Sequence, residues 1–342
     1  AEFVKKYTNY LNDKRTTLEN ERVQQQIILK ENLISLEDCL NILNRKSIGF
    51  WNKRIDQNDF LNVRIGIGNE KFKAKLNYNE EDFAIDESEL KKKANELADD
   101  YKYIKNVPLG YSLYENVTTA IMGPIDKTTT FINNIILQLI TFYSYEDLKI
   151  VVFTNKNRQK NWEYLKYLNH CFDNERKFRF FATDFESIKS VSDYLNNESM
   201  NRKNNPSSSE VNDTKPHYIV IIDGCDKLKK MEFINTVTES KENLGFSLLI
   251  LENRLSKLPS KCNNFISIGV NESILLKNSF ESQEQISFKN ELNDQIDMMN
   301  LTKRLSNIPI EFETGFRNLP NSISFLEMEK VGKVEQLNIL NR

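Results

Sequence analysis

One stretch of the chain constrains its fold more than any other: residues 116–143, NVTTAIMGPIDKTTTFINNIILQLITFY. β-Branched and apolar side chains at 117–122 predict a short strand, which the Gly123-Pro124 pair ends. Thr128, Thr129 and Thr130 are predicted to open a helix. Its buried face recurs at i, i+3 and i+4 spacing, in Phe131, Ile132, Ile135, Ile136, Leu139 and Ile140. A strand, a glycine turn and a long apolar helix therefore follow one another directly.

That succession is the structural context of the phosphate-binding pattern G-x-x-x-x-G-K-[ST]. Gly123 aligns with the first glycine and Thr130 with the final Ser/Thr, whereas Thr128 and Thr129 replace the second glycine and the lysine. Thr128 adds a Cβ where phosphate needs close backbone approach. The missing lysine removes a charge-assisted hydrogen bond worth about 1.5–3 kcal/mol. Strong ATP binding is not expected, although Lys127 could supply the charge from two positions earlier.

A second candidate position is Asp223, which ends the apolar run 218–222. A continuous apolar run is typical of a central parallel strand buried on both faces. A terminal acid in this position matches a Walker B strand, whose carboxylate holds Mg²⁺. The alternative is a strand-end carboxylate that caps a turn. Gly224 stands where such ATPases commonly carry a catalytic glutamate, and Asp226 is the acid that could substitute. We expect degenerate positions only, with no catalytic residue and no metal site.

Apolar strand patterns alternate with helix patterns along the rest of the chain. Strands are predicted at 149–154, 178–182, 218–223, 246–251 and 265–268, and helices at 159–169 and 185–195. This alternation predicts an α/β fold, a doubly wound and mostly parallel sheet of the P-loop NTPase (RecA-like) type. Residues 196–213 lack an apolar period and are predicted to form a mobile loop. Residues 302–326 are expected to contribute two short strands.

The first third of the chain has a different organisation. Residues 3–30 predict a surface or stalk helix, and Ser35 to Asp38 a capping box for a second helix ending near Asn44. An alternating strand at 60–68 is expected to pair with 72–78 as a hairpin. A helix at 87–103 and a boundary at Val107-Pro108-Leu109 follow. We therefore divide the chain into a helical stalk (1–34), a small α+β unit (35–103) and a RecA-like domain (104–342).

Composition excludes several classes of function. The 342 residues carry 47 basic and 49 acidic side chains, a net charge of −2, so no general attraction to polyanions is expected. The four cysteines, at 39, 171, 225 and 262, are scattered and only two histidines occur, which argues for reduced buried thiols rather than zinc. The longest apolar run, 131–142, is too short to cross a bilayer. The chain begins with Ala1, which indicates a fragment or a processed chain.

Two smaller features were assigned structural roles. Trp51 and Trp162 are interpreted as core anchors rather than ligand platforms. Lys156, Arg158 and Lys160 form a local basic cluster without interleaved aromatic residues, which is typical of a solvated turn.

Three segments, in order, resemble one family. Residues 50–68 (FWNKR through FLNVRIGIG) resemble the "LWeR…dFL.vRlGlG" segment of the EssC/EccC (YukB-like) proteins, the FtsK/SpoIIIE-type membrane ATPases of bacterial type VII secretion. Residues 103–109 (YIKNVPL) are similar to the run into that family's first nucleotide-fold domain. Residues 319–327 (LPNSISFLE) resemble the stretch preceding its first full motor domain.

The resemblance implies a cytoplasmic domain of a bacterial cell-membrane protein that acts in protein transport and virulence. A membrane segment would precede it and motor domains would follow, and those domains, not this segment, would use ATP and Mg²⁺. Implied partners are the downstream ATPase domains, membrane components of the machine and, indirectly, secreted WXG100-type proteins, with a possible homo-hexamer and no nucleic acid. The Asn/Lys/Ile-rich composition suits a Gram-positive, EssC-like member.

Our hypothesis from sequence is a pseudo-ATPase, a scaffolding or regulatory module between membrane and motor. One alternative is a weak Mg-ATP-binding or ATPase domain using Thr130 and Asp223, completed by a neighbouring subunit. The second is a DNA-translocase-type module, against which the balanced charge counts.

Overall fold

In the computed structural model, residues 2–73, 89–204, 215–224, 231–278 and 283–308 are described, and they form one ten-stranded sheet. Its strand order is β2-β1-β10-β9-β8-β3-β7-β6-β4-β5. From β8 to β5 all neighbours are parallel, and from β2 to β8 all are antiparallel. The parallel strands are β3 (Thr118–Met122), β4 (Leu148–Phe153), β5 (Phe181–Ala182), β6 (His217–Asp223), β7 (Phe246–Leu251) and β8 (Asn264–Ser267). The predicted doubly wound, mostly parallel sheet is confirmed.

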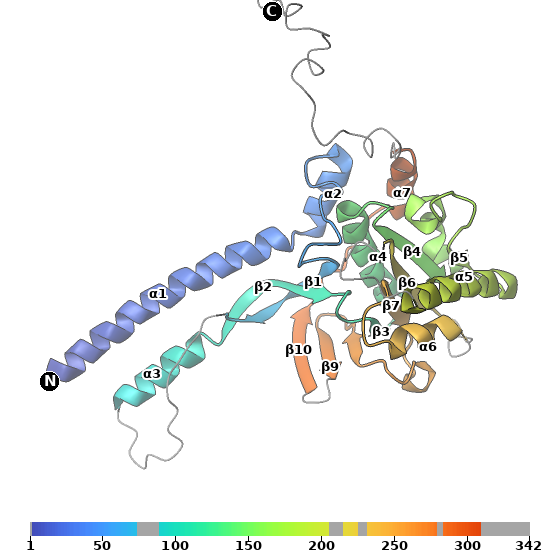
Figure 1. Ribbon diagram of the computed structural model, residues 1–342. Coiled ribbons are helices and arrows are strands. Elements are labelled where there is room, and N and C mark those ends of the chain that lie inside the picture. The colour runs from blue at the N-terminus through green and yellow to red at the C-terminus, as the bar shows by residue number, and fades with distance from the viewer. Residues whose placement is uncertain (1, 74–88, 205–214, 225–230, 279–282, 309–342) are drawn as a thin grey trace, which may run out of the picture.

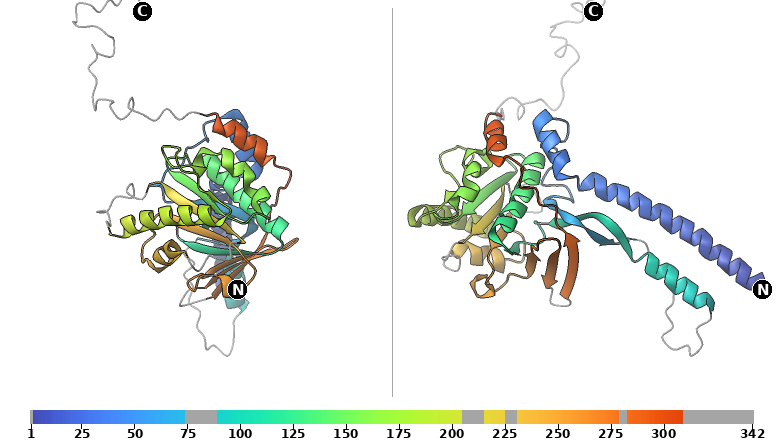
Figure 2. Two further views of the ribbon diagram at one scale, coloured as in Figure 1. Left: turned by 90° about the vertical axis from the view of Figure 1, so that its right-hand side faces the viewer. Right: turned by 180° about the vertical axis from the view of Figure 1, so that it is seen from behind.

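Helices cover both faces of the parallel part (Figures 1 and 2). One layer contains α2 (Leu36–Arg45), α4 (Ile125–Phe142), the 3₁₀ segments η1 (Gln159–Tyr167) and η2 (Asn169–Cys171), and α7 (Met298–Ser306). The other contains α5 (Phe185–Asn204) and α6 (Glu232–Glu239). Every residue of β4, β6 and β7 is buried, which explains their continuous apolar sequences.

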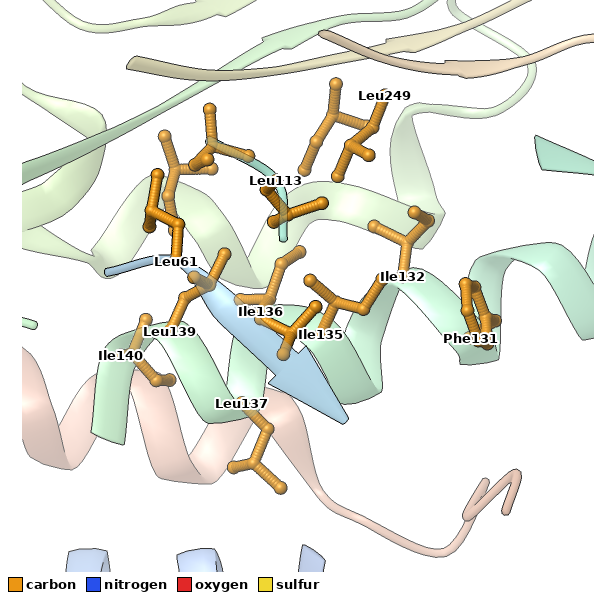
Figure 3. Close-up of a cluster of buried hydrophobic side chains, with 14 of the residues drawn as sticks. Leu61, Leu113, Phe131, Ile132, Ile135, Ile136, Leu137, Leu139, Ile140 and Leu249 are labelled. Atoms are coloured by element: carbon orange, nitrogen blue, oxygen red, sulfur yellow. The ribbon is translucent and has the colours of Figure 1, made fainter. Parts of the chain in front are cut away.

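The core centres on α4, as its apolar spacing predicted. Ile132, Ile136, Leu139 and Ile140 are completely buried and pack toward the sheet and the start of β1 (Figure 3). Each fully buried side chain of this size contributes about 1.5–3 kcal/mol through the hydrophobic effect. The helix with the strongest sequence pattern is thus also the one that organises the larger core.

A long helix and an arm project from this body (Figure 1). α1 (Glu2–Asn32) has 31 residues, about 46 Å at 1.5 Å per residue. It lies beside α3 (Glu89–Asp100) and the outer part of the β1 (Asn62–Lys71) and β2 (Tyr103–Ser112) pair. Leu11, Leu18 and Leu29 of α1 pack on a small separate cluster, formed by Phe72, Leu97, Tyr101, Ile104 and Val107.

The N-terminal elements join the same sheet and core. The predicted helix at 3–30 and the Ser35–Asp38 capping box are confirmed, and α2 ends at Arg45. β1 pairs with β2 over residues 103–112 and with β10 (Gln283–Lys289), and residues 72 and 73 of the predicted hairpin partner belong to no strand. Residues 74–78 lie outside the described part. The division predicted at residue 103 therefore falls inside one continuous sheet.

Other local predictions need correction. The Pro108 boundary lies within β2, an edge strand, where a proline's missing N–H is tolerated. α5 continues to Asn204, so 196–204 are helical rather than loop, because Leu195 and Ser199 continue its buried face. Residues 302–306 belong to α7 rather than a strand. The strand at 178–182 shortens to two residues, and the helix at 159–169 is 3₁₀.

The sequence patterns did not predict α6 or the hairpin of β9 (Ser273–Asn278) and β10. Among the described residues, no helix combines the length and the hydropathy that a membrane span requires. Three cysteines, Cys39, Cys171 and Cys262, are buried free thiols, as predicted, while Cys225 lies outside the described residues. Burial raises the pKa of the Cys39 thiol to about 12 and that of Cys262 to about 11.

Candidate functional site

The turn between β3 and α4 is the candidate phosphate site, and it consists of two residues. β3 ends at Met122 and α4 begins at Ile125, so only Gly123 and Pro124 connect them. The first helical hydrogen bond already runs from the Thr128 N–H to the Pro124 carbonyl at 2.9 Å. The expectation that Thr128 to Thr130 open the helix is therefore wrong. Without a second glycine the backbone enters the helix directly, and no extended loop remains to surround a phosphate.

Gly123 is fixed by its neighbours on both sides. Its φ of +142° is a conformation that side-chain-bearing residues rarely adopt, and a Cβ would lie 2.6 Å from the Ile268 carbonyl oxygen. Its N–H donates to Asn253 Oδ1 at 2.8 Å, and its carbonyl accepts from Asn253 Nδ2 at 3.1 Å. The Asn253 side-chain amide thus hydrogen-bonds both backbone polar groups of Gly123, including the N–H that a phosphate would need.

The three threonines lie on α4 and are occupied within the helix or buried. Thr128 Oγ1 donates to the Pro124 and Ile125 carbonyls, and Thr130 Oγ1 donates to the Asp126 carbonyl at 2.9 Å. Thr129 Oγ1 is buried without a hydrogen-bond partner among the described residues. The Thr130 hydroxyl proton is therefore committed to the backbone of its own helix.

The first turn of α4 carries one acidic and one basic side chain, whose effects on anion binding oppose each other. Asp126 lies in the first turn, where its carboxylate interacts favourably with the positive end of the helix dipole. Lys127 is on the same turn and half-buried. The carboxylate of Asp126 offsets the positive potential that makes other helix N-termini phosphate sites.

Asp223 ends β6, as predicted, and is completely buried. Its Oδ1 accepts from the Arg158 guanidinium at 2.5 Å, and its Oδ2 accepts from Trp162 Nε1 at 2.9 Å. Both oxygens of the carboxylate are therefore engaged by protein donors, and the arginine supplies the positive charge that a metal would otherwise bring. Trp162 is a core anchor as predicted, with the added role of hydrogen-bonding this acid.

In the turn at 156–160, Lys156 and Lys160 are exposed, as predicted, whereas Arg158 turns inward and pairs with Asp223. The turn after β4 folds back over Asp223 because Asn155 Oδ1 accepts the Asn157 and Arg158 N–H groups, while Asn155 Nδ2 donates to the Gly224 carbonyl at 3.0 Å. Gly224 has φ +68°, and a Cβ there would lie 2.9 Å from Asn155 Nδ2. Gly224 thus admits the Asn155 and Arg158 side chains, a role that its sequence position did not indicate. Asp226 lies outside the described residues.

The two halves of the candidate site share the carboxyl edge of the parallel sheet but not neighbouring strands. β7 lies between β3 and β6, so the strand that ends at Asp223 is not adjacent to the strand that ends at the Gly123 turn. Asn253 follows β7 and hydrogen-bonds Gly123 at the end of the neighbouring strand β3. Each half is closed by its own asparagine.

Away from the candidate site, the core contains buried ionisable side chains, among them His170, His217 and Lys149. Desolvation lowers the pKa of His170 to about 4 and that of His217 to about 3, so both imidazoles are neutral near pH 7. Among the described residues, no group of three or more histidine, cysteine or acidic side chains is arranged to hold a metal ion. Lys149 is buried, its Nζ has no hydrogen-bond partner among the described residues, and desolvation lowers its pKa to about 8.

Comparison with known proteins identifies relatives along the entire chain. It is 25% identical, over 99% of its length, to the type VII secretion system protein EssC of Staphylococcus aureus (strain NCTC 8325 / PS 47). It is 23% identical, over 98% of its length, to the ESX secretion system protein YukB of Bacillus subtilis (strain 168). The chain is an EssC/EccC-type segment. No protein-family profile matches it.

A solved structure supports the fold of this EssC/EccC-type segment. The cytoplasmic domain of the Thermomonospora curvata type VII secretion ATPase EccC superposes with a TM-score of 0.51 at 14% identity, covering 82% of this chain and 35% of that one. The predicted P-loop NTPase fold is thereby confirmed. The segment spans only 23% of the EssC relative and 22% of YukB, so the activity of any longer protein lies beyond this comparison.

Gly123 and Asp223 were predicted from the sequence, whereas the side chains that hydrogen-bond around them were not. Asn155, Arg158 and Asn253 all follow strands at the carboxyl edge, and that position was the available signal. In doubly wound sheets ligands bind at this edge, so polar residues directly after a strand are candidates for either binding or blocking a site.

Proposed function

We propose that this EssC/EccC-type segment is a non-hydrolysing scaffolding module in the cytoplasmic part of a type VII secretion protein. The observation that carries the proposal is the double closure of the ancestral site. Gly123 is held by Asn253 at the end of a two-residue turn, and Asp223 is held by Arg158 and Trp162. A nucleotide would have to break the Asn253 contacts and Mg²⁺ would have to displace Arg158, whereas an ATPase presents both groups free.

The scaffolding role follows from what the module retains. Its sheet and core are intact, and the long helix α1 is attached to that core at one end. Such a body can hold the parts of a membrane-anchored secretion protein in place without turnover. In a longer protein of the type VII secretion kind, other segments would supply the membrane attachment and the motor domains, and secreted proteins would be the substrates.

Calorimetric titration of the 342-residue chain with ATP and Mg²⁺ tests the proposal. We expect no heat of binding at micromolar nucleotide and no phosphate release. Turnover in the wild-type chain that an Asp223→Asn variant abolishes would overturn it in favour of a weak ATPase, because a contaminating enzyme would be unaffected by the substitution. Salt-sensitive DNA binding would instead indicate a translocase-type module.

A further inference from the structure

Exposed apolar side chains gather on the turns that close the candidate site. Ile125 is 47% exposed, Leu255 64% and Val270 75%. They follow β3, β7 and β8, which are neighbours in the order β8-β3-β7 and run parallel. Their turns therefore lie side by side at the carboxyl edge, and we refer to these three residues as the edge surface.

Hydrogen bonds hold the turns of the edge surface together. The Ile268 N–H donates to the Met122 carbonyl at 2.8 Å, and Asn253 holds Gly123 from the other side. The backbone groups of Gly123, the Met122 carbonyl and the Ile268 N–H are thus paired between the turns, and the three apolar side chains are exposed beside them. A phosphate loop would instead leave the N–H of its glycine free for the ligand.

The surroundings of the edge surface resemble a protein interface. Charged residues of both signs flank the three apolar residues in sequence: Asp126, Lys127, Arg254 and Glu272. An apolar centre with a polar rim is typical of protein–protein contacts. A cleft of about 580 Å³ adjoins Val270, with Ile67 and Phe288 as its other apolar lining residues. It provides a concavity beside the most exposed of the three side chains.

We propose that the edge surface docks another folded domain of the same polypeptide. This inference rests on the proposed function, that the segment is one module of a longer secretion protein. The chain covers only 23% of its EssC relative, so further domains of such a protein would be tethered nearby. Tethering gives millimolar effective concentrations, so a small contact suffices. Contacts between domains of one chain are commonly about 600–1,500 Å² and more polar than obligate interfaces, which fits a small apolar centre with a charged rim.

A photo-crosslinking experiment in the full-length polypeptide tests the inference. The amino acid p-benzoylphenylalanine is placed at Leu255 or Val270 and, as matched control, at Met200, which is 44% exposed on α5. We expect cross-links from 255 and 270 to residues of the same polypeptide outside this segment, at least tenfold above those from 200. Cross-links to the edge surface of a second copy, or to a different protein, would overturn the inference. So would a yield no higher than at Met200.

A charge substitution provides a second test. Leu255→Asp combined with Val270→Asp should abolish cross-linking from a probe at Ile125, whereas Met200→Asp should leave it unchanged. All three sites are exposed, so the thermal unfolding of the variants should match that of the wild type. Unchanged cross-linking in the double variant would contradict domain docking. ATP binding in the calorimeter would instead contradict the proposed function, so the two failures are distinguishable.

Discussion

At the scale of single residues, the main feature of the carboxyl edge of the sheet is a buried carboxylate with its own protein partners. Asp223 is completely buried, and its tolerance of that position depends on Arg158 and Trp162. A lone buried carboxylate would be strongly unfavourable, whereas one with a guanidinium and an indole N–H is accommodated. The contacts that stabilise the acid occupy both of its carboxylate oxygens.

Replacing Arg158 should therefore destabilise the protein. In Arg158→Met the Asp223 carboxylate keeps only the Trp162 hydrogen bond, and we expect a loss of about 1–3 kcal/mol in the free energy of unfolding. Urea denaturation at pH 7 measures it. Lys156→Met, at an exposed position of the same turn, is the control and should change stability by less than about 0.5 kcal/mol. Equal stability of the two variants would show that the ion pair is not required.

The burial of Lys149 makes the free energy of unfolding depend on pH, because burial disfavours the charged amine. Its amine is buried beside the Tyr145 ring without a hydrogen-bond partner in the described part of the chain, and burial lowers its pKa from 10.5 to about 8. The folded protein binds this proton less tightly than the unfolded chain does, so the cost is fully present below pH 8 and is relieved as pH rises toward 10.5. That difference corresponds to an upper bound of about 3 kcal/mol.

Lys149→Met should consequently be more stable than the wild type at pH 7, with a smaller difference at pH 10. Urea denaturation at both pH values checks this, and Lys160→Met, at an exposed position, serves as a control without a pH-dependent effect. A wild-type stability that does not rise relative to Lys149→Met between pH 8 and 10 would contradict the assignment.

At the scale of elements, the decisive feature is where α4 begins. A phosphate loop needs residues that leave the strand and bend around the ligand, and here the helix starts three residues before the predicted threonines. Thr128 and Thr130 reinforce that start through bonds to carbonyls three or four residues earlier. Changing two side chains does not lengthen the turn.

Restoring the consensus should therefore fail to restore the site. In the double variant Thr128→Gly, Thr129→Lys we expect no ATP affinity in the micromolar range, and a loss of stability because glycine weakens the first turn of α4 by about 1 kcal/mol relative to alanine. Isothermal titration and thermal unfolding check both. Thr130→Ser keeps a hydroxyl in α4 and should leave both properties near those of the wild type. Micromolar binding by the double variant with full stability would mean that the pocket is open.

At the scale of the whole molecule, Arg64 connects the long helix to the sheet. Its guanidinium forms a bidentate pair with Glu291 and donates to the carbonyl of Leu33, just beyond α1, at 2.9 Å. Its backbone N–H and carbonyl are held by the side-chain amide of Gln138 on α4. Four separate parts of the chain meet at this one residue, so the direction of α1 is set from the core.

Arg64→Ala should loosen that attachment. We expect faster amide hydrogen exchange in the last turns of α1 and a loss of about 1.5–3 kcal/mol from the charged hydrogen bonds. Lys71→Ala, which removes the exposed pair with Glu284, should cost less than about 1 kcal/mol and leave exchange in α1 unchanged. Identical exchange in the wild type and Arg64→Ala would show that α1 is positioned by its apolar contacts alone.

The sequence by itself determined the elements whose signals are local. The α4 periodicity, the Ser35 capping box and the apolar runs of β4, β6 and β7 predicted those elements, because each pattern reports interactions within a few residues. Only the tertiary structure decided which side chains contact Gly123 and Asp223, and which strands pair with β1. The Gly123–Asn253 bonds join residues 130 positions apart, and the Arg158–Asp223 pair joins residues 65 apart. Such contacts leave no periodic trace in the sequence, since the packing of the whole sheet is what brings these side chains together.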